Sequence, residues 1–114
     1  MNTVSVPTFT ATIYVGTYDK ALGLHQHTEE INKMCQEYVD KVGLCVTVTK
    51  TDFCYTDGHE GGAAIGLINY PRFPMEPNQI RKHALALAEI LKEGMRQERV
   101  SVVFPNETIM IGPK

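Results

Sequence analysis

Apolar and polar residues alternate along this chain in two different rhythms. In several segments, β-branched and aromatic residues alternate with polar ones or form short apolar runs, and both patterns are typical of β-strands. The segments with this pattern are residues 9–16, 44–55, 63–70, 99–104 and 108–111. Pro105-Asn106-Glu107 separates the last two, which predicts a turn between them.

Two other stretches follow helical spacing. Thr28 can cap the first helix, with acidic residues in its first turn, and Gly43 is a natural stop because glycine adopts the left-handed conformation easily. Pro77 suits the first turn of a second helix, where its missing N–H is not needed. The predicted inward stripe of this second helix is Ile80, Ala84, Leu87, Leu91 and Met95.

The order of these elements, βαββαββ, predicts an α+β fold. Adjacent strands in hairpins favour a mostly antiparallel sheet, and both helices are expected to pack on one of its faces. We expect one ligand-binding domain over residues 1–114, with residues 1–8 as a loose lead-in. The segment Gly16–His27 is predicted to be a loop, and Thr56–Gly62 the loop of a long hairpin.

Composition and charge argue against several classes of function. The 114 residues carry a formal net charge of −2 without a basic run, so binding of duplex DNA or RNA is not expected. No stretch approaches the roughly 20 apolar residues of a membrane helix, and residues 1–8 lack the pattern of a signal peptide. With three widely spaced cysteines, we expect reduced thiols and a cytoplasmic location.

No strong catalytic or metal-binding motif is present. Asp57, His59 and Glu60 lie in a glycine-rich segment that predicts a flexible hairpin tip, where side chains are poorly held for chemistry. His25 and His27 lack a third metal ligand, and Cys54 has no basic partner in the sequence. We therefore expect no cofactor and no metal.

The segment from Asn69 to Pro74 is more unusual. Beside and between its prolines it carries aromatic rings that can stack on a base, an arginine that can pair with phosphate, and an amide that can bond to polar edges. A stiff connector with buried aromatics explains these residues equally well. Further along, Arg99 is either a phosphate anchor or a surface charge.

Four segments together resemble the Thoeris anti-defence family of phage proteins. They are residues 13–16 (IYVG), 35–49 (CQEYVDKVGLCVTVT), 66–74 (GLINYPRFP) and 97–111 (QERVSVVFPNETIMI). The resemblance implies a sponge that binds and sequesters a cyclic ADP-ribose-type nucleotide without cleaving it; some members also hold cyclic oligonucleotides. It also implies dimers that gather into hexamers, with the ADP-ribose pockets at the dimer interface.

Transferred to this chain, the resemblance assigns Phe73 to stacking on the ligand and Arg99 to its pyrophosphate. Tyr70, Asn69 and Arg72 are further expected ligand-binding residues. The small size of the domain independently favours a homo-oligomer, because ligand pockets often form where chains meet. The absence of a recognisable catalytic set predicts that the protein is not an enzyme.

Two other hypotheses remain open at this point. One is a small phosphodiesterase or hydrolase that uses Asp57, His59 and Glu60 as acid–base groups. The other is a structural or adaptor subunit without a small ligand.

Overall fold

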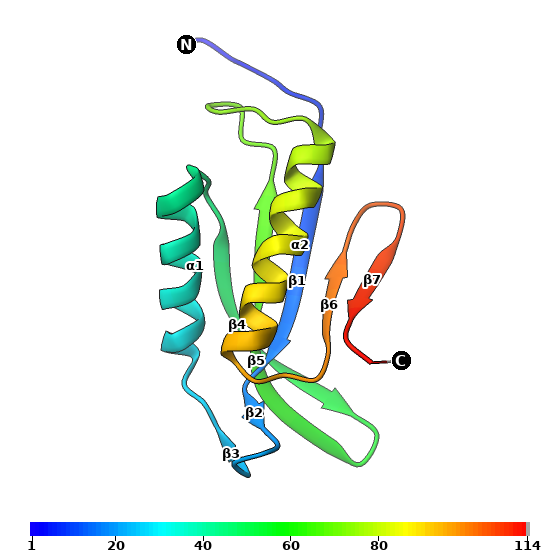
Figure 1. Ribbon diagram of the computed structural model, residues 1–114. Helices are drawn as coiled ribbons and strands as arrows, with labels where there is room; N and C mark the ends of the chain where they lie inside the picture. Colours follow the sequence, from blue (N-terminus) through cyan, green and yellow to red (C-terminus); the bar gives the residue numbers. More distant parts are fainter. Residues whose placement is uncertain (114) are drawn as a thin grey trace.

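A five-stranded antiparallel sheet with two helices on one face forms the body of the protein (Figure 1). The computed structural model describes residues 1–113, and the strand order in the sheet is β4-β5-β1-β6-β7. The predicted α+β architecture with both helices on one face is confirmed. The elements are β1 (Thr10–Gly16), β2 (Tyr18–Asp19), β3 (Leu24–His25), α1 (Thr28–Val42), β4 (Thr47–Tyr55), β5 (Gly58–Ile68), α2 (Pro77–Gly94), β6 (Val100–Val103) and β7 (Thr108–Ile111).

Both helices begin and end close to the predicted residues. Gly43 ends α1 in the left-handed conformation (φ 74°), as expected, whereas His27 takes the N-cap position and Thr28 is already helical. Pro77 is the first residue of α2, and Glu76 and Gln79 cap it reciprocally. Among the helices of residues 1–113, none is long and apolar enough to cross a membrane.

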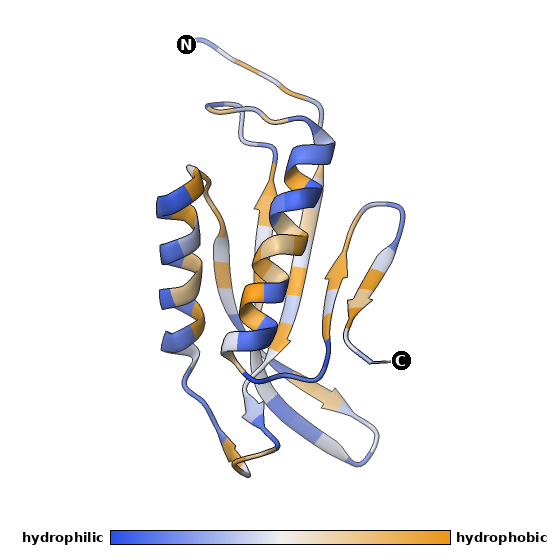
Figure 2. Cartoon of the chain, in the orientation of Figure 1, coloured by the Kyte–Doolittle hydropathy of each residue, from blue (hydrophilic) through white to orange (hydrophobic). Residues whose placement is uncertain are grey.

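The core lies between the sheet and the helices. Side chains at alternate positions of β1 and β5 point towards the helices, and all five predicted inward residues of α2 are buried against them. On α1, the side turned towards α2 is largely apolar and the opposite side is polar (Figure 2). The strand residues that form the centre of this core are Ala11, Ile13, Val15, Ala63, Ile65, Leu67, Val100 and Val102.

The opposite face of the sheet is not covered by any other element of the described chain (Figure 1). The positions between the core residues point to this side. Tyr14 of β1 lies between Ala64 of β5 and Ser101 of β6 in the strand register. We call this surface the open face.

The hairpin of β4 and β5 differs from its prediction. The sequence predicts a loop over Thr56–Gly62, but β5 begins at Gly58, and the connection is a tight turn with Asp57 at a φ of 61°. Phe53 pairs with Glu60 in the ladder, so this carboxylate lies on a strand and not on a flexible tip. Strand pairing with the alternating residues of β4 outweighs the turn tendency of the glycines.

The predicted loop Gly16–His27 contains a small hairpin of its own. β2 and β3 pair through Tyr18 with His25 and through Asp19 with Leu24. Gly23 adopts a φ of 66° in the connection, which explains the glycine there. This small hairpin lies at the end of the sheet where β1 ends (Figure 1).

Candidate functional site

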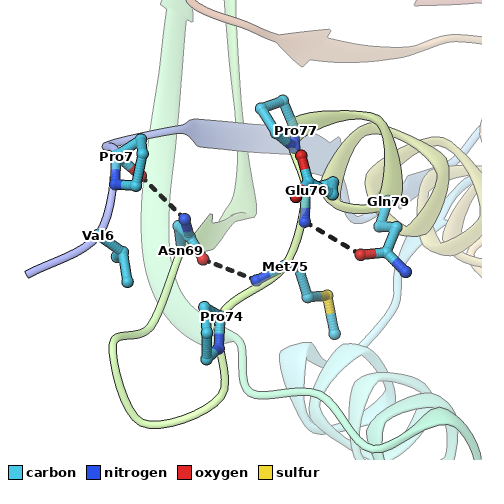
Figure 3. Close-up of a pocket in the computed structure, with 8 residues that line it drawn as sticks. All are labelled: Val6, Pro7, Asn69, Pro74, Met75, Glu76, Pro77 and Gln79. Carbon is cyan, nitrogen blue, oxygen red and sulfur yellow. Dashed lines mark hydrogen bonds between the residues drawn. The ribbon is translucent and has the colours of Figure 1, made fainter.

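The predicted residues between Asn69 and Phe73 lie at the end of the sheet where β5 ends. The Asn69 side chain connects two backbone segments: its Nδ2 donates to the Pro7 carbonyl (2.8 Å), and its Oδ1 accepts from the Met75 N–H (2.9 Å) (Figure 3). Both polar ends of the amide are therefore used to shape this connection. A hollow beside it is lined by Val6, Pro7, Asn69, Pro74, Met75, Glu76, Pro77 and Gln79.

The aromatic residues of this segment pack against each other. The rings of Tyr70 and Phe73 are 5.4 Å apart between centroids, with Phe73 40% exposed, and Arg72 is exposed. A hydrogen bond with Cys45, together with burial, raises the pKa of the Tyr70 hydroxyl. None of these side chains is joined to a cluster of charged groups by a hydrogen bond or ion pair found among residues 1–113.

Arg99, the other main predicted contact, lies at the opposite end of the sheet. It precedes β6 near the end of β1, where Gly16 pairs with Gly62, whereas Phe73 follows the end of β5, where Thr10 pairs with Ile68. Gly16 lies six positions along β1 from Thr10, which corresponds to about 20 Å. The structure thus does not bring Phe73 and Arg99 together within one chain.

Two adjoining hollows surround Arg99. One has a volume of about 200 Å³ and the other about 240 Å³. Each is smaller than the roughly 300–1,000 Å³ of ordinary small-molecule sites, but they share Glu60, Gln97 and Arg99 and together reach that range. We call the first the charged hollow; it is lined by Tyr18, Lys20, Glu60, Arg96, Gln97, Glu98 and Arg99. The second is the aromatic hollow, lined by Tyr14, Gly16, Phe53, Tyr55, Glu60, Gln97, Arg99 and Ser101.

The Glu60 carboxylate is held at the junction of the two hollows. Its Oε2 accepts a hydrogen bond from the Tyr18 N–H (3.1 Å). Gly16 makes this approach possible, because a Cβ on Gly16 would lie 2.5 Å from that oxygen and 3.0 Å from Gln97 Oε1. A carboxylate fixed by a strand and a backbone N–H is oriented before any ligand arrives.

Gln97 fixes the surrounding backbone. Its Nε2 donates to the carbonyls of Tyr18 (2.9 Å) and Met95 (3.0 Å). The Gln26 side chain donates to the same Met95 carbonyl (2.8 Å). The small hairpin of β2 and β3 is therefore tied to the connection between α2 and β6.

Aromatic rings form the wall of the other hollow. Tyr14 and Phe53 meet edge to face, with centroids 6.2 Å apart, and Tyr14 and Tyr55 are 40% and 57% exposed. Side chains of β4 lean over glycines of β5: a Cβ on Gly58 would lie 2.5 Å from the Tyr55 ring, and one on Gly62 2.4 Å from Phe53. Such a wall can stack on a purine base or contact a cation through its ring faces.

The charged hollow carries side chains of both signs, with three basic and two acidic residues in its lining. Glu98 is paired with Lys20 (3.8 Å) and with Arg99 (3.3 Å). Arg99 also donates through Nε to the Pro113 carbonyl (3.0 Å). Arg96 is paired instead with Asp19, at 3.0 Å. A phosphate or carboxylate group can be bound here.

The acid–base set considered from the sequence is not assembled. His59 and Glu60 are neighbours on a strand, so their side chains point to opposite faces, and Asp57 sits in the turn. Of these three, only Glu60 lines either hollow. The His25 ring instead packs against Tyr18, 5.0 Å between centroids. Within residues 1–113, no three His, Cys, Asp or Glu side chains form a group that could hold a metal ion.

Sequence reasoning missed most of this site. Arg99 was among the expected ligand contacts, but Tyr14, Phe53, Gln97 and Arg96 were not. One sequence pattern indicates the aromatic wall. If residues 53–60 form a tight hairpin, Phe53 and Tyr55 lie two positions apart on one strand, and their side chains point to the same face as that of Glu60. The contribution of residues 96–97 depends on how the connection after α2 crosses the end of the sheet.

Comparison with known proteins supports the fold. No protein-family model matches the sequence, and no curated protein matches it either. Among solved structures, the chain is similar to a phage SAM lyase in complex with S-methyl-5'-thioadenosine, with a TM-score of 0.81 and 18% identity over 99% of this chain and 95% of that one. It is also similar to a phage SAM lyase in the apo state, with a TM-score of 0.73 and 19% identity over 93% and 90% of the two chains.

These similarities correct one expectation from the sequence. The prediction that the protein is not an enzyme rested on the lack of an ordered catalytic group, and the proteins that share the fold are lyases. The physical reason for the error is the hairpin: the carboxylate assigned to a flexible tip is held on a strand beside an aromatic wall. At these identities the comparison establishes that the chain has the fold of the phage SAM lyases.

Proposed function

We propose that this protein is a phage anti-defence enzyme that binds S-adenosylmethionine in the joined hollows and cleaves its carbon–sulfur bond. The observation that carries the proposal is the position of Glu60, whose carboxylate lies where an aromatic wall meets a charged hollow. The shared fold with lyases that act on this substrate supports it. Removal of host S-adenosylmethionine would disable defence systems that depend on it.

The two hollows match the two parts of this substrate. An adenine can stack on the rings of Tyr14, Phe53 or Tyr55 in the aromatic hollow. The amino-acid tail carries an ammonium and a carboxylate, which suit the mixed charges of the other hollow. The sulfonium between them would then lie close to Glu60, where a carboxylate and ring faces both favour a cation.

The chemistry needs few groups from the protein. When the bond from sulfur to the four-carbon fragment breaks, its electron pair goes to sulfur, so S-methyl-5'-thioadenosine leaves as a neutral thioether. No acid has to protonate this leaving group. The fragment is completed either by losing a proton to a carboxylate base as a double bond forms, or by closing onto its own carboxylate. Both routes balance without water, and the mass of the second product distinguishes them.

The test is direct. Purified protein is incubated with S-adenosylmethionine, and the products are separated by chromatography and identified by mass. Release of S-methyl-5'-thioadenosine that scales with protein concentration supports the proposal. Unchanged substrate at high protein concentration, or release at the same rate by a preparation of Glu60→Gln, contradicts it.

Binding of a cyclic ADP-ribose-type nucleotide is the second candidate for the same hollows. Its adenine would use the aromatic wall and its pyrophosphate Arg99. Contact with Phe73 would require a second copy, because Phe73 and Arg99 lie at opposite ends of the sheet. Calorimetric titration with a cyclic ADP-ribose isomer, with and without S-methyl-5'-thioadenosine in excess, tests whether both ligands compete for one place.

We further propose that the protein is a homo-oligomer of at least two copies. The open face carries exposed aromatics and no described element covers it, so the aromatic hollow opens directly onto a surface that a second copy can close. Light scattering at micromolar concentration should then give a multiple of 12.7 kDa. A monomer with full activity would contradict this.

A further inference from the structure

The most buried charged side chain of the described protein is Asp19. It is 0% exposed, and its Oδ1 accepts hydrogen bonds from the N–H groups of Ala21 (3.0 Å) and Leu22 (3.1 Å). The other oxygen, Oδ2, lies 3.0 Å from Arg96 Nε, at ion-pair distance, although the N–H is not directed well enough for a hydrogen bond. Burial of a carboxylate is unfavourable without such a partner. Arg96 is therefore held by a group that cannot turn to solvent.

The backbone of Arg96 shows the same constraint. Its φ is 55°, in the left-handed region that residues with a Cβ adopt rarely, directly after the C-cap of α2. Glycine is the usual residue for such a position because it takes this conformation without steric penalty. Here the position carries an arginine whose side chain is 57% exposed and lines the charged hollow. The pairing with Asp19 offsets the unfavourable backbone conformation.

The charges around Arg96 leave part of its guanidinium available. Glu98 is already shared by Lys20 and Arg99, and Glu60 accepts the Tyr18 N–H. Asp19 engages only the Nε edge of Arg96, and no other residue of the described chain pairs with it. The two Nη groups remain, and this planar pair is the arrangement that binds a carboxylate through two parallel hydrogen bonds.

We infer that Arg96 binds the α-carboxylate of the substrate's amino-acid tail, and that Asp19 is the positioning residue that holds Arg96 for this contact. The inference rests on the proposed function, because it assigns the charged hollow to the tail of that substrate. It has a consequence for specificity. The protein distinguishes adenosine thioethers that carry an amino-acid tail from those that lack one.

Two uncleaved probes separate tail recognition from nucleoside recognition. S-adenosylhomocysteine has the adenosine and the amino-acid tail but no sulfonium, and S-methyl-5'-thioadenosine has the adenosine without the tail. Calorimetry gives the Kd of each for the full-length protein. Arg96→Gln should raise the Kd for S-adenosylhomocysteine at least tenfold and change that for S-methyl-5'-thioadenosine less than twofold.

Further variants distinguish positioning from general stability. Asp19→Asn should lower the preference for the tailed probe in the same direction but by a smaller factor. Arg96→Lys keeps the charge without the planar pair and should give an intermediate preference; it also provides the measurement if Arg96→Gln does not fold. Arg81→Gln is the matched control, since Arg81 pairs with Glu107 and lies over Phe104 away from both hollows, and its preference should be that of the parent.

The outcomes are separable. A parent protein that binds both probes, with an Arg96→Gln variant that keeps the preference or loses both probes equally, overturns this inference and leaves the proposed function standing. A parent protein that binds neither probe overturns the proposed function and the inference with it. Selective loss of the tailed probe in Arg96→Gln and Asp19→Asn, but not in Arg81→Gln, supports both.

Discussion

Phe53 and Glu60 face each other across the ladder of β4 and β5, and both side chains lie on the open face of the sheet. This pairing puts an aromatic ring next to a carboxylate with a fixed spacing set by the backbone. Under the proposed function, this pair lies where the substrate's sulfonium would bind.

Replacement of Glu60 by glutamine should slow cleavage of S-adenosylmethionine by on the order of 100- to 1,000-fold, because it removes the one fixed negative charge at the junction of the hollows. Initial rates of S-methyl-5'-thioadenosine release measure the effect. Glu89→Gln, on the exposed side of α2, is the matched control and should keep the parent rate. Equal rates for the two variants would show that Glu60 has no part in the reaction.

Alanine at Gly16 should disturb the site without disturbing the fold. The added Cβ would meet the Glu60 carboxylate and the Gln97 amide, and displacement of a reactive group by about 1 Å can lower a rate on the order of 100-fold. Gly61→Ala is the control, because a Cβ there would come no closer than 3.6 Å to Thr17 Oγ1. Steady-state rates and thermal unfolding of both variants should be measured together. A Gly16→Ala protein with the parent rate would mean that the position of Glu60 is unimportant.

Loss of the Phe53 ring should weaken nucleoside binding. Phe53→Ala removes a stacking surface worth about 1–3 kcal/mol, so the Kd for S-methyl-5'-thioadenosine should rise about five- to 150-fold. Phe73→Ala is the informative comparison, since Phe73 lies at the opposite end of the sheet in the same protomer. An equal effect of Phe73→Ala would place a second copy's segment beside the ligand, as the cyclic ADP-ribose hypothesis requires.

Asn69 should prove important for stability and not for ligand binding. Asn69→Ala removes both side-chain bonds that join β5 to the chain on either side of it, and it should lower the free energy of unfolding by about 1–3 kcal/mol. Urea unfolding measures this, with Asn78→Ala on the exposed first turn of α2 as the control. An unchanged free energy of unfolding together with weaker nucleoside binding would indicate that Asn69 contacts the ligand.

Cys35 and Cys54 should differ sharply in reactivity. Burial raises the pKa of the Cys35 thiol to about 11 from 9.0, whereas Cys54 is exposed on β4. Iodoacetamide at pH 8 should therefore modify Cys54 first and reach Cys35 only after unfolding, as peptide mass mapping will show. The raised pKa also means that the thiol ionises more readily in the unfolded chain. The contribution of Cys35 to the free energy of unfolding should therefore be fully present below pH 9 and decline as the pH rises towards 11. Rapid modification of Cys35 in the native protein would contradict this account.

The fold was largely predictable because its elements follow local rules. Helical spacing after Thr28, the stop at Gly43 and the start at Pro77 each depend on a few neighbouring residues. The same local reasoning failed at Thr56–Gly62, where glycines suggested a loop and pairing with β4 imposed a strand. Tertiary pairing decides such segments, and it is not visible in a window of a few residues.

The site was less predictable than the fold. The sequence identifies Arg99 as a candidate phosphate contact, but Tyr14 and Phe53, which line a hollow with it, come from distant parts of the chain. Gln97 is 79 positions from the Tyr18 carbonyl that it binds. Such contacts follow from strand order and from the path of the connection after α2, which hydrophobic patterns alone do not determine.

The way β4 side chains lean over β5 glycines links the sequences of the two strands. The Tyr55 ring occupies the space where Gly58 would carry a Cβ, and the Phe53 ring does the same at Gly62. At Gly62 a Cβ would also lie 2.4 Å from the Val15 carbonyl oxygen, so a smaller residue at position 53 would not make room there. At Gly58 the nearest atoms all belong to the Tyr55 ring, so substitutions at Tyr55 and Gly58 should be non-additive, and a larger residue at position 58 is expected only together with a smaller one at position 55.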